Sequence, residues 1–223
     1  MIKKFFIFLI AVFISMQFIC AHQPRLIYDK TSPVYEQVYN PEISQAFYGE
    51  LKGNPDYYFI NSTKGFDLYI NILAPDIAGA RTDFSVKIFS VMENFTLNNS
   101  QEWKSFYEEF GGDRYLMGPE FERNVTSGIY LIEVSNLNNS GEYSLAIGKI
   151  ESFPLNEALK SIYSIIRLKH DFFKKNYFAF FEGIIGKGVG LLFLVLITII
   201  LGVLLVLKKI RNRKKKKDRK KDS

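Results

Sequence analysis

A run of twenty uncharged residues, Gly188 to Leu207, constrains this chain more than any other feature. An α-helix rises about 1.5 Å per residue, so such a run covers the hydrocarbon core of a bilayer, which is about 30 Å thick. Residues 208–223 follow with eleven Lys or Arg and two Asp, a net charge of +9. Basic segments beside a membrane helix tend to stay in the cytoplasm. The sequence therefore predicts a single-pass protein of the cell membrane, with a transmembrane helix at 188–207, a cytoplasmic tail at 208–223 and an extracytoplasmic amino terminus.

The net charge changes sign once this tail is set aside. The whole chain carries +6, of which the tail contributes +9 and the residues Lys3 and Lys4 contribute +2, so residues 22–187 carry −5. An acidic domain is not expected to bind nucleic acid. A basic tail can contact nucleic acid, but beside a membrane helix it more commonly contacts anionic lipid headgroups. We therefore expect membrane lipid as the partner of residues 188–207 and of the tail, and no nucleic acid.

Residues 1–21 have the layout of a secretory signal peptide. Lys3 and Lys4 precede an apolar run, Phe5 to Ile14, that is too short to span a bilayer comfortably, and a small residue, Ala21, follows it. Cleavage after Ala21 leaves His22 as the first residue of the mature chain.

Cys20 is the only cysteine of the chain. Lipid attachment at this residue is the alternative to cleavage after Ala21. Bacterial lipid attachment favours a small residue before the cysteine, whereas here Ile19 precedes it. If Cys20 leaves with the signal peptide, the mature domain has no disulfide, no thiol nucleophile and no thiolate metal ligand.

Residues 46–151 form a series of short β-prone runs separated by turn residues. In the run FDLYINIL, Phe66, Leu68, Ile70 and Ile72 alternate with other residues, so one face of a strand can be buried and the other exposed. The connectors are rich in Asn and Gly, which adopt turn conformations at little cost. The pattern predicts an all-β ectodomain, a jelly-roll-like antiparallel β-sandwich. Residues 22–45 hold three prolines and predict an extended amino-terminal arm or edge strand.

Residues 152–187 change to the period of a helix. Apolar residues recur at steps of three and four from Leu155 to Phe173, and Pro154 suits a first turn. The sequence predicts an amphipathic juxtamembrane helix that is rich in Phe and Tyr. Two placements stay open: the helix lies at the bilayer surface, where such rings are favoured, or it packs against the sandwich.

One segment, Ser127 to Gly148, resembles the closing hairpin of bacterial pre-peptidase C-terminal (PPC-like) domains. That family has a strand of the form G-x-Y-x-(I/V)-x-V, a turn, and a strand of the form G-x-Y-x-L-x-(I/V). The resemblance covers about 90 residues within 46–151 and implies a non-catalytic accessory module. The chain is also similar to uncharacterised secreted proteins that carry such a domain and a carboxy-terminal membrane helix. The matching residues are Gly128, Tyr130, Ile132, Val134, Gly141, Tyr143, Leu145 and Ile147.

The inventory of reactive side chains argues against an enzyme. Only His22 and His170 are available for catalysis that uses histidine, and His170 lies in the expected helix, where a surface position is favoured. Zinc sites built from His and Cys lack ligands. An acidic cluster offers a carboxylate pair for acid/base work or oxygen ligands for calcium, but an exposed loop is the simpler interpretation. The cluster comprises Glu108, Glu109, Asp113, Glu120 and Glu122.

Aromatic residues around this cluster suggest a binding surface for a protein or a glycan, although packing over the edge of the sandwich explains them equally well. The chain also has five Asn-x-Ser/Thr sites in or beside expected turns. The candidate surface comprises Trp103, Phe106, Tyr107, Phe110, Asp113, Tyr115, Glu120 and Phe121, and the glycosylation candidates are Asn61, Asn94, Asn98, Asn124 and Asn138.

His22 carries a second hypothesis. The amino group and imidazole of an amino-terminal histidine can chelate Cu(II), as in histidine-brace copper proteins. A brace needs a further ligand from the sandwich, and the expected core strands offer no histidine for it. Two functions therefore stay open: a non-catalytic, membrane-anchored module that needs no cofactor and binds a protein, glycan or envelope polymer, or a copper-binding protein that uses the mature His22.

Overall fold

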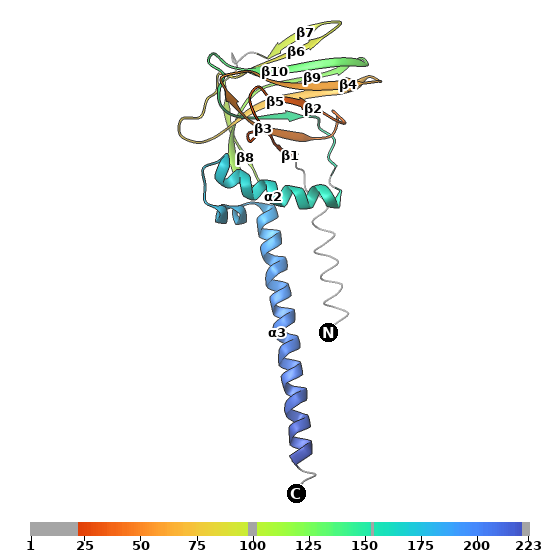
Figure 1. Cartoon of the computed structure of the whole chain (residues 1–223), viewed down its shortest axis with the longest axis vertical. Helices are drawn as coiled ribbons and strands as arrows, with labels where there is room; N and C mark the ends of the chain where they lie inside the picture. Colours follow the sequence, from red (N-terminus) through yellow and green to blue (C-terminus); the bar gives the residue numbers. More distant parts are fainter. Residues whose placement is uncertain (1–21, 98–101, 153, 220–223) are drawn as a thin grey trace.

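The computed structural model describes residues 22–97, 102–152 and 154–219, and the side chains up to residue 213 (Figure 1). The expected signal peptide, Cys20 and the Asn98 site lie outside the described residues. The predicted β-sandwich is confirmed: two sheets pack face to face and a long carboxy-terminal helix follows them.

The six-stranded sheet has the order β1-β3-β11-β5-β9-β8. Its outer face lies next to the helix α2 (Figure 1). Its strands are β1 (Gln23–Leu26), β3 (Gln45–Lys52), β5 (Phe66–Pro75), β8 (Lys104–Glu108), β9 (Asp113–Val125) and β11 (Ser140–Ile147).

The five-stranded sheet has the order β2-β4-β10-β6-β7 and lies on the far side of the sandwich from α2 (Figure 1). Its strands are β2 (Tyr35–Gln37), β4 (Asp56–Ser62), β6 (Ser85–Ser90), β7 (Asn94–Leu97) and β10 (Gly128–Ser135).

The residues between 22 and 45 supply one edge strand to each sheet. β1 pairs with β3 and β2 pairs with β4, and both pairs are parallel, whereas the other strand pairs are antiparallel. The sheets are therefore mixed rather than wholly antiparallel. Parallel neighbours need a crossover instead of a hairpin. The rest of the arm connects β1 to β3, and the connection from β2 to β4 passes through β3 in the other sheet.

The strand β5 shows why the sandwich forms. Phe66, Leu68, Ile70 and Ile72 are at most 4 % exposed and belong to the main core between the two sheets. Alternation along a strand sends every second side chain to the same face, and this face is apolar. Burying four such side chains contributes on the order of 1.5–3 kcal/mol each.

The expected closing hairpin is wrong. β10 pairs with β4 and β6, whereas β11 pairs with β3 and β5, so the two strands lie in opposite sheets. The chain crosses from one sheet to the other through the short turn after Ser135. Tyr130, Ile132, Tyr143 and Leu145 then face the same core from both sides.

A polar network lies inside the core. The hydroxyl of Tyr143 donates to Asp56 Oδ2 at 2.7 Å and lies 2.7 Å from the hydroxyl of Tyr58, while Asp56 Oδ1 accepts the backbone N–H of Val34 at 2.9 Å. Burial raises the pKa of Asp56, although its hydrogen bonds oppose that shift. The Tyr143 ring fits against Gly49 on the paired strand, where a Cβ atom would lie 2.5 Å from the ring.

Replacing Tyr143 with Phe is expected to lower the free energy of unfolding by about 1–3 kcal/mol, because the buried Asp56 carboxyl loses a hydrogen-bond donor. Denaturant unfolding of the protein measures this change. Tyr39→Phe is the matched control, since the Tyr39 side chain is 74 % exposed and should tolerate the change. An unchanged midpoint for Tyr143→Phe would show that the network adds nothing to stability.

The expected helix at 152–187 is divided into two helical segments before the long helix begins. α2 (Leu155–Asp171) ends at a reversal in which Lys174 has φ 55°, and the 3-10 helix η1 (Tyr177–Glu182) follows. The Asn176 side chain accepts the backbone N–H of Ala179 and so caps η1. The reversal places η1 beside α2 instead of extending it.

α2 has the second of the two placements that the sequence left open, against the sandwich, and its placement at a bilayer surface stays a prediction. One face is buried at Ser161, Ile165 and Leu168 against the outer face of the six-stranded sheet. The opposite face exposes apolar side chains, including Leu155 and Leu159, which are 73 % and 62 % exposed. The helix is therefore packed on the sandwich and still presents an apolar surface.

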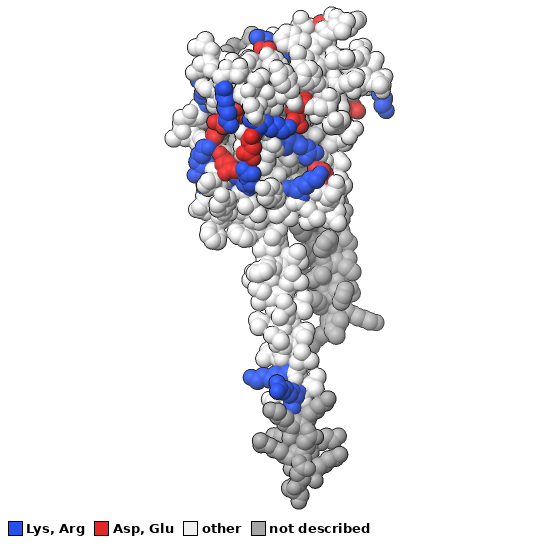
Figure 2. All heavy atoms as spheres, in the orientation of Figure 1, with Lys and Arg blue, Asp and Glu red and all other residues white. Residues whose placement is uncertain are grey.

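α3 (Ile184–Arg219) extends away from the sandwich (Figure 1). Residues Ile184–Arg213 are long and apolar enough to cross a membrane. On the face that Figure 2 shows, the helix carries no charged side chain until the basic residues near its far end, and Lys187 is a charged residue in its first turn.

Candidate functional site

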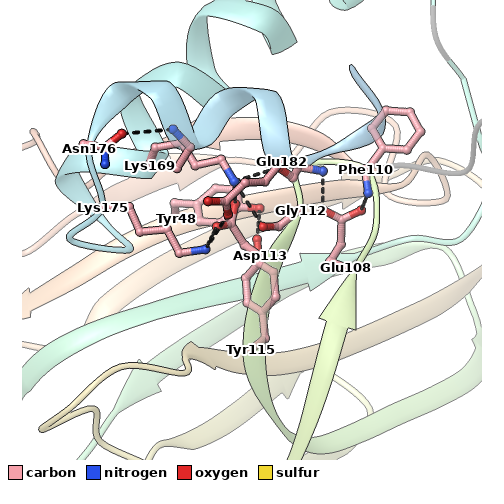
Figure 3. A network of polar contacts seen from close by, with 12 residues as sticks. Tyr48, Glu108, Phe110, Gly112, Asp113, Tyr115, Lys169, Lys175, Asn176 and Glu182 are labelled. Atoms are coloured by element: carbon pink, nitrogen blue, oxygen red, sulfur yellow. Dashed lines mark hydrogen bonds and ion pairs between the residues drawn. The ribbon is translucent and has the colours of Figure 1, made fainter. Parts of the chain in front are cut away.

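The β8–β9 hairpin, α2 and η1 meet around one carboxylate. Asp113 Oδ2 lies 2.6 Å from Lys169 Nζ, and Asp113 Oδ1 lies 3.0 Å from Lys175 Nζ. Lys169 Nζ also donates to the carbonyl oxygen of Gly111 at 2.7 Å. Figure 3 shows both lysines pointing toward Asp113, and we call this group the Asp113 network.

The centre of the Asp113 network is shielded from solvent. The side chains of Lys169 and Asp113 are 0 % and 3 % exposed. Burial lowers the pKa of Lys169 from its usual value, while the ion pair with Asp113 opposes the shift. The ammonium group of Lys169 already donates hydrogen bonds to a carboxylate and a carbonyl. The arrangement is therefore suited to holding α2 against the β8–β9 hairpin.

The carboxylate of Glu108 is also fully engaged in hydrogen bonds within the protein. Its two carboxylate oxygens accept the backbone N–H groups of Phe110 and Gly111, each at 2.7 Å, and so shape the hairpin turn. Burial raises the pKa of Glu108, although these hydrogen bonds oppose the shift. Two more of the predicted acidic residues have separate partners, since Glu120 accepts the Tyr69 hydroxyl and Glu122 pairs with Lys149, and the fifth, Glu109, is exposed.

The hairpin is also joined to the start of α3 through the backbone. Ile184 N–H donates to Glu109 O at 3.0 Å, and Ile185 N–H donates to Phe110 O at 3.3 Å. Gly183 allows this approach because a Cβ atom there would lie 2.2 Å from Gly111 O. The sandwich is therefore docked directly on the first residues of α3.

A cavity of about 590 Å³ lies between the outer face of the six-stranded sheet and α2, beside this docking point. Tyr48, Leu73 and Ala146 line it from the sheet, and Ile165 and Leu168 line it from α2. Its size falls within the range of about 300–1,000 Å³ that is usual for ligand sites. We call it the juxtamembrane cavity.

The predicted binding surface is not one exposed surface. Phe110, Asp113 and Tyr115 are buried at the docking point, at 8 %, 2 % and 5 % exposure. Trp103 and Phe121 pack against the main core. Phe106 and Tyr107 are exposed on β8 and line the juxtamembrane cavity, and Glu120 is exposed on β9.

A different aromatic group lies on the outer face of the five-stranded sheet. Tyr35 stacks on Tyr57 with ring centroids 5.3 Å apart, and Phe59 lies 6.3 Å from Tyr35. Tyr35 is 63 % exposed. Beside this group, Lys87 and Glu133 form an ion pair on the neighbouring strands. We call Tyr35, Tyr57 and Phe59 the aromatic stack.

A sequence signal for the aromatic stack exists. In DYYFIN, Tyr58 and Ile60 occupy alternate positions and are buried, so Tyr57 and Phe59 must face outward. The partner Tyr35 comes from the arm, and its pairing with Tyr57 is a long-range contact that alternation does not reveal.

The two histidines have different surroundings. His170 is exposed, stacks on Tyr177 and contacts Asp171. His22 immediately precedes β1, and its Nδ1 atom contacts the hydroxyl of Ser44. Desolvation lowers the pKa of His22, and the Glu151 carboxylate opposes this shift.

The copper hypothesis gains no further ligand from the fold. Within residues 22–97, 102–152 and 154–219, no three His, Cys, Asp or Glu side chains come together to hold a metal ion. The contact between Nδ1 of His22 and Ser44 also uses the atom that a histidine brace needs. Mature His22 as a copper ligand stays a prediction.

Four of the five predicted glycosylation sites lie in the described part of the chain, and all four asparagines are exposed. Asn124 donates to Asp67 at 2.8 Å, so a glycan on its amide nitrogen would alter this contact. The four are Asn61, Asn94, Asn124 and Asn138.

Comparisons with known proteins give structural likenesses only. No protein-family model and no curated protein matches the chain. The pre-peptidase C-terminal domain of a collagenase from Bacillus anthracis is 14 % identical, with a TM-score of 0.31, and the match covers 54 % of this chain and 98 % of that one. The CBM35 module from Cellvibrio japonicus Abf62 is 12 % identical, with a TM-score of 0.28, over 45 % of this chain and 70 % of that one.

CorA, a surface-associated copper-binding protein of Methylomicrobium album BG8, is 9 % identical, with a TM-score of 0.30. That match covers 54 % of this chain and 100 % of CorA. At these scores the likenesses carry no inference about ligand or activity.

Proposed function

We propose that this chain is a non-catalytic, membrane-anchored binding module that holds its sandwich close to the membrane and binds a protein, glycan or envelope polymer. The observation that carries the proposal is that the outer faces of the two sheets point in opposite directions relative to the helices. The six-stranded sheet turns its outer face toward α2 and α3, whereas the five-stranded sheet turns its outer face away from them (Figure 1). The aromatic stack lies on this second face.

The chemistry of that face suits a partner with both apolar and polar surface. Half-buried aromatic rings provide rigid contact area at a small cost in side-chain entropy. The Lys87–Glu133 ion pair provides hydrogen-bonding groups beside them. The resemblance of residues 127–148 to PPC-like domains agrees with an accessory binding role, and α3 with its basic end agrees with a membrane anchor whose tail is cytoplasmic.

The test is binding of the full-length protein in lipid nanodiscs to arrays of glycans and envelope polymers, and to proteins of the native membrane. Tyr35→Ala together with Tyr57→Ala is expected to weaken binding about tenfold, because two stacking rings are lost. Tyr39→Ala is the matched control, since Tyr39 is 74 % exposed and lies outside the aromatic stack. Undiminished binding by the double variant, or turnover of a bound polymer, would contradict the proposal.

A further inference from the structure

The juxtamembrane cavity exists because small residues face each other across it. Ala46, Ser144 and Ala146 lie on the sheet side, and Ser161 lies on the α2 side. Larger side chains at these positions would fill the space between sheet and helix, as they do in the close-packed main core. The sequence therefore maintains a cavity here with four small residues.

The interior of the cavity suits a neutral, apolar molecule. Most of its lining is apolar, including Leu73, Ile165, Leu168 and Phe173. Its acidic and histidine lining residues are Glu108, Glu109, Asp113, Glu151 and His22. None of the described lining residues is Lys or Arg. The carboxylates of Glu108 and Asp113 are already engaged with backbone amides and lysines, so they offer no pairing to a ligand charge.

Among the described residues, one buried polar atom in the lining has no hydrogen-bond partner. The hydroxyl oxygen of Ser161 is buried without a hydrogen bond, and the whole residue is 1 % exposed. Buried hydroxyl groups are normally satisfied, so an unpartnered one in a cavity wall points to a group that the cavity receives. A weakly polar group along an otherwise apolar ligand would meet it.

The position of the cavity indicates where such a ligand comes from. Ile184 and Ile185, the first residues of α3, line one end of it. Ile184 and the lining residue Phe106 are 40 % and 43 % exposed, so this rim is open and presents apolar side chains beside the exposed lining residue Glu109. The cavity thus adjoins the point where α3 would enter a bilayer.

Apolar side chains are also exposed on the helical segments that precede α3. Exposed side chains on α2 and η1 include Leu159, Tyr163 and Phe178, at 62 %, 61 % and 81 % exposure. Figure 2 shows uncharged atoms on the margin of the sandwich next to α3. Such a surface favours contact with the headgroup and acyl boundary of a bilayer.

We propose that the juxtamembrane cavity is a lipid site that receives a long acyl chain past Ile184, with the polar end of the lipid left outside at the bilayer surface. A membrane phospholipid and a free fatty acid share this chemistry. The phospholipid is the expected source, because a fatty acid carboxylate at this rim would meet the acidic residues Glu108 and Glu109. The inference does not depend on the ligand of the aromatic stack.

The experiment uses the full-length protein in phosphatidylcholine nanodiscs that contain a phosphatidylcholine with a photoactivatable group near the end of one acyl chain. After irradiation, mass spectrometry of peptides is expected to find the label at Tyr48 or Tyr115. Both residues lie on the sheet and line the cavity, at 8 % and 5 % exposure, so the bilayer reaches them only through it. Label in α3 is also expected from the surrounding bilayer and serves as the internal reference.

Two variants fill the cavity from opposite sides: Ala146→Phe from β11 and Ser161→Leu from α2. Each is expected to reduce label at Tyr48 and Tyr115 about tenfold relative to label in α3. Thr96→Phe places the same aromatic ring at an exposed position of β7, outside the cavity, and should leave the label unchanged. Retained circular dichroism and a cooperative denaturant unfolding transition show that a variant is folded, and neither measurement involves the ligand of the proposed function.

A parallel arm replaces the phospholipid with a photoactivatable fatty acid. Stronger label at Tyr48 and Tyr115 from the phospholipid supports the expected source, whereas stronger label from the fatty acid overturns that source and keeps the acyl-chain site. Label confined to α3 in both arms overturns the site itself. Label at the two tyrosines that neither filling variant reduces overturns it as well.

Discussion

Replacing Asp113 with Ala is expected to lower the free energy of unfolding by about 3–5 kcal/mol, the usual cost of removing one partner from a buried ion pair. The substitution leaves the ammonium of Lys169 buried with carbonyl partners but no counter-charge. Lys175 loses the same partner, but its side chain is 36 % exposed and can turn to water. Denaturant unfolding of the full-length protein in micelles measures the loss.

The loss should depend on pH in a defined direction. Burial already lowers the pKa of Lys169, and Asp113 opposes that shift, so removing Asp113 lowers the pKa further. In the window between that lowered pKa and the usual value of about 10.4, the unfolded chain binds more protons than the folded one. The unfolding free energy of the variant should therefore rise with pH through this window.

Two comparisons separate the buried pair from ordinary surface charges. Combining Asp113→Ala with Lys169→Met removes both charges, and the double variant is expected to be more stable than Asp113→Ala alone. Glu122→Ala removes an exposed partner of Lys149 and should cost no more than about 1 kcal/mol. A double variant that is as unstable as the sum of its parts would mean that Lys169 and Asp113 are not energetically coupled.

The sequence predicts well where structure depends on local periodicity. Alternation in FDLYINIL correctly placed Phe66 to Ile72 in the core, and the uncharged run after Gly188 correctly placed a helix able to cross a membrane. Each signal lies within one element. The helical period of the apolar residues also predicted an amphipathic helix, and α2 has one buried face. That face, however, includes the polar residues Ser161 and Lys169.

The sequence does not predict contacts between residues that are far apart in the chain, or the sheet to which a strand after a short turn belongs. Asp113 and Lys169 are 56 residues apart, so no spacing rule pairs them. β10 and β11 are joined by a short turn, which is typical of a hairpin. Each strand nevertheless pairs with two neighbours in its own sheet and not with the other. For the aromatic residues from Trp103 to Phe121 the sequence left a binding surface and packing on the sandwich equally open. Packing applies to several of them, because Phe110 and Tyr115 are buried at the docking point and Trp103 and Phe121 pack against the main core.

Replacing Gly183 with Ala is expected to separate the β8–β9 hairpin from the start of α3 while the sandwich stays folded. The added Cβ atom would lie 2.2 Å from Gly111 O and 2.4 Å from Phe110 O, both of them backbone atoms that cannot rotate away. Relief requires the hairpin to move, which lengthens the hydrogen bonds from Ile184 and Ile185 to it. Overpacking of this kind typically costs about 1–3 kcal/mol.

Hydrogen exchange and distance measurements distinguish undocking from unfolding. The amides of Ile184 and Ile185 are expected to exchange faster in the variant, whereas amides in β10 and β11, at the centre of the two sheets, keep their protection. Spin labels at Thr96 on β7 and at Asn212 near the end of α3 should give a broader distance distribution, because the sandwich can then tilt on the helix.

Gly202→Ala is the matched control within the same helix. A Cβ atom at this position meets nothing within 4 Å, so the same chemical change should leave both exchange and distances as they are. A Gly183→Ala protein with the distance distribution of the unmodified chain would show that backbone contacts at Gly183 do not hold the sandwich. A rigid docking point matters for both proposals, because it fixes the aromatic stack away from the bilayer and keeps the rim of the juxtamembrane cavity beside the lipid.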